Sequence, residues 1–103
     1  MEPKLDAQEY ESAALDLIIF MSGQDAPDSA FYAGITSDPM KRLFDEHQLP
    51  HTQPHKVVRC ENNQEARELE KQLRKSGCEG GPGGGDESSE YVYVYLMSPQ
   101  TRP

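Results

Sequence analysis

Apolar and polar positions divide the first part of the chain into three segments. Residues 5–14 place apolar side chains on one face of a helix, and Asp6 can cap its start. Residues 15–21, LDLIIFM, are rich in β-branched and aromatic side chains and contain the longest apolar run, residues 17–21, which predicts a buried strand. Residues 30–35, AFYAGI, predict a second strand after the turn cluster 22–29. Because this link is short, we expect the two strands to pair as a hairpin.

After residue 36, apolar residues recur with the spacing of a helix. Asp38 can accept hydrogen bonds from free backbone N–H groups, and Pro39 suits the first helical position because its missing N–H is not needed there. The packed face of this helix is predicted to consist of the residues at i, i+3, i+4 and i+7, namely Met40, Leu43, Phe44 and His47. Residues 49–50, Leu-Pro, are expected to end it.

The second half of the chain predicts two more strands around another helix. Residues 56–60, KVVRC, predict a strand, and residues 91–96, YVYVYL, alternate between tyrosine and aliphatic side chains as a strand does. Between these strands, a helix capped by Asn62 or Asn63 is expected to run to about Lys75.

The linking segments complete the predicted fold. Gly77 is placed to end the helix before it, the glycine-rich residues 78–90 predict a flexible loop, and residues 98–103 predict a flexible tail. The length suggests one domain over residues 1–103. The order of elements predicts an α+β fold, with a small three- to four-stranded, mostly antiparallel sheet flanked by helices.

Charge is unevenly distributed along the chain. The net charge is −8, which argues against general nucleic-acid binding, but residues 41–75 carry +2 and the remainder carries −10. All three histidines, His47, His51 and His55, lie in this central part. Residues 41–75 therefore either meet the phosphates of DNA or form an ordinary solvated surface, and both interpretations stay open.

Two further features concern the cellular location. No apolar run approaches the roughly 18 residues that a membrane span needs, and the start of the chain is too acidic and polar for a secretory signal peptide. Cys60 and Cys78 are too few for a zinc site, so reduced thiols are the simpler interpretation. We therefore expect a cytoplasmic protein that does not enter a membrane. Its oligomeric state is left open.

Glu70 is the first candidate for a catalytic or metal-binding residue. On the predicted helix it falls between an apolar stripe and a basic stripe, the latter made of Arg67, Lys71, Arg74 and Lys75. A carboxylate in this position could hold a divalent metal where phosphates arrive. Alternatively, Glu70 is a surface residue that pairs with Arg74 or Arg67 along the helix.

Tyrosines on the strands are the other candidates. Tyr32 lies beside Gly34 in the 30–35 strand, where a half-buried aromatic residue is the simpler interpretation. Tyr91, Tyr93 and Tyr95 share one face of the 91–96 strand. Three tyrosines in a row either stack nucleobases or cover the sheet against a helix.

Residues 32–47, YAGITSDPMKRLFDEH, closely resemble the second half of the GIY-YIG nuclease signature. In that family a Y-x-G motif ends a strand, and the following helix carries an arginine ten residues after the tyrosine and often a histidine five further on. Arg42 and His47 have this spacing from Tyr32. Farther along, Ala66 and Glu70 match the alanine and the metal-binding glutamate of the family. Together these matches cover roughly residues 15–76, the predicted core.

The resemblance implies a three-stranded antiparallel sheet flanked by helices and the hydrolysis of phosphodiesters with Mg²⁺ or Mn²⁺. Carried over residue by residue, Glu70 is the metal ligand and Arg42 steadies the phosphate. Tyr32 is the second-motif tyrosine, which steadies the phosphate and the attacking water, and His47 is an auxiliary residue.

Two departures from the family pattern bear on activity. The first motif should end in a tyrosine about a dozen residues before Tyr32, and Phe20, which follows Ile18 and Ile19, stands there instead. A phenyl ring cannot accept a proton or hydrogen-bond a water. The asparagine that usually follows the glutamate also has no match, because no Asn follows Asn63.

Three hypotheses remain. The chain is a weak or inactive nuclease domain that meets DNA through residues 41–75, or a non-catalytic module on the same fold that binds a protein partner. In the third hypothesis it is an active nuclease in which His47 or another tyrosine serves as the general base in place of the missing first-motif tyrosine.

Overall fold

The computed structural model describes residues 7–80 and 88–102, and their side chains from residue 13 onward. Its elements, in chain order, are α1 (Ala7–Ser22), η1 (Asp28–Ala30), β1 (Phe31–Thr36), η2 (Lys41–Glu46), β2 (His55–Arg59), α2 (Asn63–Lys75) and β3 (Tyr91–Leu96). Within the described ranges, no helix is long and apolar enough to cross a membrane.

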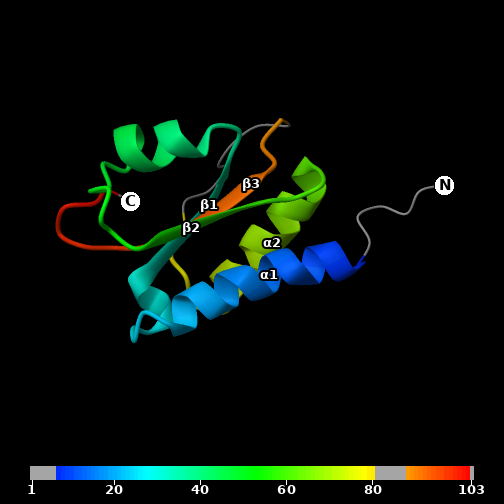
Figure 1. The fold of residues 1–103 in the computed structure, drawn as a ribbon, viewed down its shortest axis with the longest axis horizontal. Coiled ribbons are helices and arrows are strands. Elements are labelled where there is room, and N and C mark those ends of the chain that lie inside the picture. The colour runs from blue at the N-terminus through cyan, green and yellow to red at the C-terminus, as the bar shows by residue number, and fades with distance from the viewer. Residues whose placement is uncertain (1–6, 81–87, 103) are drawn as a thin grey trace.

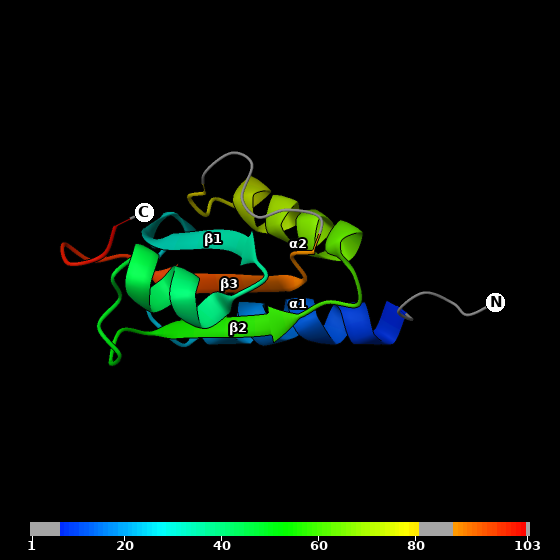
Figure 2. The same ribbon diagram turned by 90° about the horizontal axis from the view of Figure 1, so that it is seen from above.

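Three antiparallel strands form an open sheet in the order β1-β3-β2, so the last strand of the chain is the central one. Figure 1 shows α1 and α2 on one side of this sheet and η2 on the other. Seen from above in Figure 2, α2 lies along the β1 side and α1 beneath β2. The predicted α+β fold, with a small antiparallel sheet flanked by helices, is confirmed.

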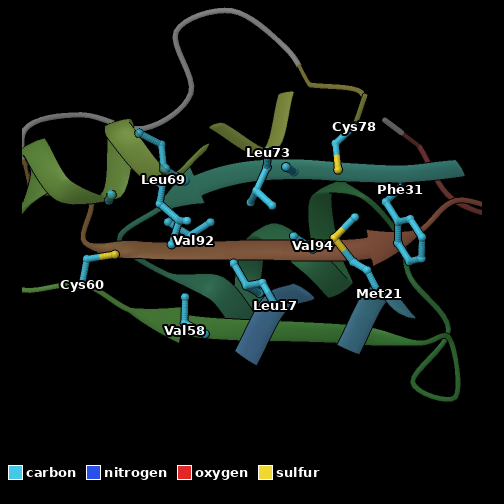
Figure 3. Close-up of a cluster of buried hydrophobic side chains, with 13 residues drawn as sticks. Leu17, Met21, Phe31, Val58, Cys60, Leu69, Leu73, Cys78, Val92 and Val94 are labelled. Carbon is cyan, nitrogen blue, oxygen red and sulfur yellow. The ribbon is translucent and has the colours of Figure 1, made fainter. Parts of the chain in front are cut away.

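Alternation along β3 divides the buried side chains between the two faces of the sheet. Val92 and Val94 join the larger core, to which α1 contributes Leu17 and α2 contributes Leu69 (Figure 3). Tyr93 and Tyr95 point to the opposite face and pack with Leu43 of η2 and Leu49 in a smaller core. The tyrosines therefore cover the sheet beneath a helix, as the second interpretation of this strand predicted.

The prediction of a strand over residues 15–21 is wrong, and so is the hairpin with the 30–35 segment. These residues are the second half of α1, in which Leu17 and Met21, four positions apart, face the core. Leu15 and Ile19 remain 54% and 61% exposed. A short apolar run is compatible with either a strand or a helix. Because apolar side chains lie on all sides of this segment, the helical spacing of its buried positions is seen only in the structure.

The helix after β1 starts as predicted and then widens. The carboxylate of Asp38 accepts the Lys41 N–H at 3.2 Å. Residues 41–46 form a π-helix, in which the His47 N–H donates to the Arg42 carbonyl five residues back at 2.9 Å. Of the four predicted packed positions, Leu43 and His47 are buried and Phe44 packs against the smaller core, whereas Met40, which precedes the π-helix, is 63% exposed.

The second helix agrees closely with its prediction. Asn62 caps α2 by accepting the Glu65 N–H at 2.9 Å, and Gly77 takes a positive φ of 127° just after the helix. Next, Glu79 forms a parallel bridge to Tyr32 along the outer side of β1. Residues 81–87, within the predicted 78–90 loop, lie outside the described residues.

The end of the chain differs from the flexible tail expected over residues 98–103. Thr101 is buried, and its hydroxyl oxygen accepts the Ser98 N–H at 3.0 Å, which closes a turn. The Arg102 N–H then donates to the His47 carbonyl at 2.7 Å. Residue 103 lies outside the described residues.

Candidate functional site

A group of hydrogen-bonded aromatic side chains lies between η2 and the sheet. His47 leaves the end of η2 and places its Nε2 atom 2.7 Å from the Tyr93 hydroxyl. Its Nδ1 atom lies 2.6 Å from the carbonyl oxygen of Arg102 and 3.1 Å from the Tyr95 hydroxyl. Both ring nitrogens of one buried histidine are therefore engaged by groups from the C-terminal part of the chain.

Tyr32 completes this group from the neighbouring strand. Its ring lies 4.8 Å from the His47 ring and stacks on Tyr95 with centroids 5.4 Å apart. Tyr32 is half-buried, whereas His47, Tyr93 and Tyr95 are buried. We call these four residues, Tyr32, His47, Tyr93 and Tyr95, the Tyr–His cluster.

Gly34 makes room for the cluster. It pairs directly with Tyr93 in the sheet, and a Cβ atom at Gly34 would lie 2.6 Å from Cζ of the Tyr93 ring. Real Cβ atoms do not approach ring atoms so closely, so any side chain here would displace the tyrosine. The glycine two residues after Tyr32 is thus required by the tyrosine on the adjacent strand.

Arg42 lies on η2, close enough to the cluster for its charge to act on His47 and Tyr93. Its Nε atom pairs with Glu46 at 3.1 Å, and 31% of its side chain is exposed. Burial lowers the pKa of His47, the carbonyl of Arg102 opposes this, and the Arg42 charge lowers the pKa further. Burial also raises the pKa of Tyr93, and here the Arg42 charge acts in the opposite direction. At pH 7 the imidazole and the phenol are therefore both neutral.

Glu70 lies in a separate groove on α2. Its carboxylate pairs with Arg74 at 3.5 Å, as the simpler interpretation predicted, and only 14% of the side chain is exposed. Burial raises the pKa of Glu70, whereas the charges of Arg74 and Arg67 oppose the shift. Lys71 and Lys75 also line this groove.

The groove and the cluster approach β1 from different sides. Glu79 and Gly80 line the Glu70 groove, and Glu79 also bridges to Tyr32. A Cβ atom on Gly80 would lie 3.0 Å from the carbonyl oxygen of Ala33, so this segment runs against β1. The structure thus gathers Tyr32, Arg42 and His47 at one location, and Glu70 lies across the edge strand from them.

Two acidic residues of the groove bear on the Mg²⁺ or Mn²⁺ expected from the sequence. Magnesium keeps several waters and binds proteins through one or two carboxylates together with substrate phosphates. Glu70 and Glu79 both line the groove, and the carboxylate of Glu70 is paired with Arg74 there. In the described part of the chain, no group of three or more His, Cys, Asp or Glu side chains is arranged to hold an ion.

The sequence pattern does not place Tyr93 beside His47. Phe20, which stands at the position of the family's first-motif tyrosine, lies in α1 and packs edge-on against Phe31 at 6.1 Å. The strand that pairs with β1 is β3 instead, and it carries Tyr93 opposite Gly34. The alternation of YVYVYL already indicated a strand with tyrosines on one face, but its partner strand was not visible in the sequence.

Comparisons of the chain with protein-family models, with curated proteins and with solved structures find no match.

Proposed function

We propose that this protein is a weak, metal-dependent phosphodiesterase of the GIY-YIG type that acts on DNA, in which Tyr93 supplies the hydroxyl that Phe20 lacks. The observation that carries the proposal is the 2.7 Å hydrogen bond between Tyr93 and His47, beside Tyr32. A tyrosine on the strand that pairs with β1 is thereby available, although it follows Tyr32 along the chain.

Tyr32 and Arg42 are the more exposed members of the site, so we assign them to the phosphate. The guanidinium of Arg42 can bind two phosphate oxygens at once. Its present partner, Glu46, has a side chain that is 45% exposed, and exposed ion pairs contribute only about 0–1 kcal/mol. An incoming phosphate can therefore replace Glu46.

His47 and Tyr93 lie behind these residues and provide a proton acceptor. The neutral imidazole can take the phenol proton while the phenol oxygen takes a proton from water, which leaves hydroxide to attack the phosphate and an imidazolium at His47. Burial of that cation opposes the step and slows it. Tyr93 is only 2% exposed, so water reaches it when neighbouring side chains move. This requirement is the reason for expecting slow turnover.

Glu70 completes the proposal as the metal ligand. Glu70, with Glu79 in the same groove, would hold Mg²⁺ or Mn²⁺, which would supply Lewis-acid stabilisation of the charge on the phosphate. The proposal requires that one phosphate reach this metal and Arg42 together, across the edge of β1. The cations beside Glu70 would bind the neighbouring phosphates of the nucleic acid.

Labelled single- and double-stranded DNA, incubated with the protein and Mn²⁺, tests this function. The wild-type protein should cleave, and Tyr93→Phe, Arg42→Ala and Glu70→Gln should each lower the rate by on the order of 100-fold, as for the loss of a general base or a charge-stabilising group. Tyr91→Phe is the matched control, because Tyr91 lies on the same strand but contacts Arg59 instead of His47.

Cleavage by a folded Tyr93→Phe protein at the wild-type rate would refute the role of Tyr93. The metal assignment has its own readout, because Mn²⁺ should broaden NMR signals around Glu70 in the wild-type protein and not in Glu70→Gln. Unchanged broadening in that variant would remove Glu70 from the site.

One observation favours the alternative of a non-catalytic protein-interaction module. The outer side of α1 exposes Leu15, Ile18 and Ile19, and Ile18 borders a hollow between α1 and α2. An apolar surface of this kind suits a protein partner. This alternative becomes the better account if the wild-type protein neither cleaves DNA nor responds to Mn²⁺ near Glu70.

A further inference from the structure

The last residues of the chain hold His47 at two points. The Arg102 N–H donates to the His47 carbonyl at 2.7 Å, and the Arg102 carbonyl lies 2.6 Å from Nδ1 of the same residue. Both contacts use the backbone of Arg102, and its side chain is exposed. A segment that is 55 residues away in sequence thus clamps the imidazole from one side.

The segment is itself held in place. Thr101 is 8% exposed, and its hydroxyl both accepts the Ser98 N–H and donates to the Ser98 carbonyl, each at 3.0 Å. One residue earlier, the Met97 N–H donates to the Ala30 carbonyl at 2.9 Å. The turn is therefore continuous with β3 and anchored to the start of β1.

The chemistry of these contacts allows one tautomer of the neutral ring. A carbonyl oxygen only accepts hydrogen bonds, so a 2.6 Å contact with the Arg102 carbonyl requires a proton on Nδ1. With the proton on Nε2 instead, the lone pair of Nδ1 would face the lone pairs of that oxygen. Nε2 must then accept, and the Tyr93 hydroxyl at 2.7 Å is the donor.

We propose that the C-terminal segment Ser98–Arg102 is a positioning element that fixes His47 as the Nδ1–H tautomer and so makes Nε2 the acceptor of the Tyr93 proton. Its effect on catalysis rests on the function proposed above, whereas its effect on the tautomer does not. The remaining polar groups that face the ring from neighbouring elements are Tyr32, Tyr95, Arg42 and Glu46. Of these, the Tyr95 hydroxyl lies 3.1 Å from Nδ1 and is itself able to accept its proton as a second partner.

The nitrogen chemical shifts of the His47 ring, measured by long-range ¹H–¹⁵N NMR on the unshortened 103-residue chain, test the assignment directly. At neutral pH the wild-type protein should show a protonated Nδ1 and an unprotonated Nε2. A protonated Nε2 with an unprotonated Nδ1 would overturn the proposal without the need for any variant.

Two variants test whether the C-terminal segment is responsible. Arg102→Pro removes the N–H that bonds to the His47 carbonyl, and a chain that ends at Ser98 removes the Arg102 carbonyl itself. The Nε2–H form should gain population in both, most strongly in the shortened chain. Arg102→Ala is the matched control, since it keeps both backbone groups and should give wild-type shifts. A shortened chain that is folded and keeps the wild-type tautomer would overturn the proposal.

DNA cleavage by the same proteins separates this inference from the proposed function. If both are right, the shortened chain should cleave on the order of tenfold or more slowly, because the acceptor nitrogen is protonated in part of the molecules. If the wild-type protein shows the nitrogen chemical shifts of the Nδ1–H tautomer but cleaves no DNA, the tautomer assignment stands and the nuclease function is refuted. Cleavage at the wild-type rate by a shortened chain with an altered tautomer would overturn the catalytic role of the segment.

Discussion

His47 shows how strongly one residue depends on its surroundings. The spacing from Tyr32 and Arg42 marked it as an auxiliary residue, but spacing does not specify what its ring nitrogens bind. In the structure, a backbone carbonyl and a tyrosine hydroxyl occupy the two nitrogens, and burial keeps the ring neutral. A protonated ring would have to donate from both nitrogens in a buried place, which is unfavourable there.

The lowered pKa of His47 predicts a specific dependence of stability on pH. Because the unfolded chain binds the proton more tightly than the folded one, the free energy of unfolding should fall as the pH drops below the ordinary histidine pKa of 6.5. The loss should continue until the pH passes the folded-state pKa, at about 1.4 kcal/mol for each pKa unit of difference.

Urea unfolding of the wild-type protein and of His47→Gln at pH 5 to 8 measures this contribution. Glutamine can donate to the Arg102 carbonyl and accept from Tyr93 but does not titrate, so the difference in unfolding free energy between the two proteins should narrow toward low pH. A constant difference over this range would contradict a lowered pKa for His47.

At the scale of elements, packing decides whether the second half of α1 is a helix or a strand. Its apolar side chains project on all sides of the helix, and only one side packs on the sheet. Leu17 is fully buried there, while Leu15, two positions earlier, is 54% exposed. In a strand these two residues would share a face, so their different burial is characteristic of a helix.

Leu17→Ala and Leu15→Ala should therefore differ sharply. Removing a fully buried leucine costs about 2–5 kcal/mol, because it leaves a cavity as well as losing apolar contacts. Removing an exposed leucine should change stability by about 0.5 kcal/mol or less. Urea unfolding followed by circular dichroism compares the two, and equal losses would contradict the observed orientation of α1.

The π-helix η2 is the second element that sequence periodicity does not describe. Its wider turn closes with the His47 N–H bonded to the Arg42 carbonyl, five residues back. Bulges of this kind often occur at functional sites. Here the π-helix ends directly at the histidine whose ring contacts Tyr93.

At the scale of the whole molecule, the acidic chain concentrates basic side chains in one groove. The net charge is −8, yet Arg67, Lys71, Arg74 and Lys75 line the groove of Glu70. Repulsion by the rest of the protein should weaken binding to DNA over long distances, and it is screened by salt. The local cations should still bind phosphates directly, with the release of counterions.

If the proposed function is right, Lys71→Glu should weaken DNA binding and reduce the salt dependence of the affinity by about one counterion. Lys56→Glu is the control, because it makes the same change in charge on an exposed position of β2, outside the groove. Fluorescence anisotropy with labelled DNA at several salt concentrations compares them. Equal weakening by both variants would mean that only the net charge matters and would argue against a specific groove.

Local signals in the sequence determined much of this protein. The caps at Asp38 and Asn62, the glycine at position 77 and the alternation of residues 91–96 act over a few residues, and each predicted its element correctly. Tyr32, Arg42 and His47, whose spacing carries the family resemblance, lie on one strand and the helix that follows it, and the rings of Tyr32 and His47 are in contact.

Tertiary structure decided the features that depend on distant segments. A short apolar run forms a helix or a strand according to what packs on it. Residues 15–21 form part of a helix, and β3 takes the place beside β1 that was predicted for them. Tyr93 reached His47 for the same reason, across 46 residues of sequence. No local pattern records which strands pair, since pairing is determined by the side chains buried on both faces of the sheet.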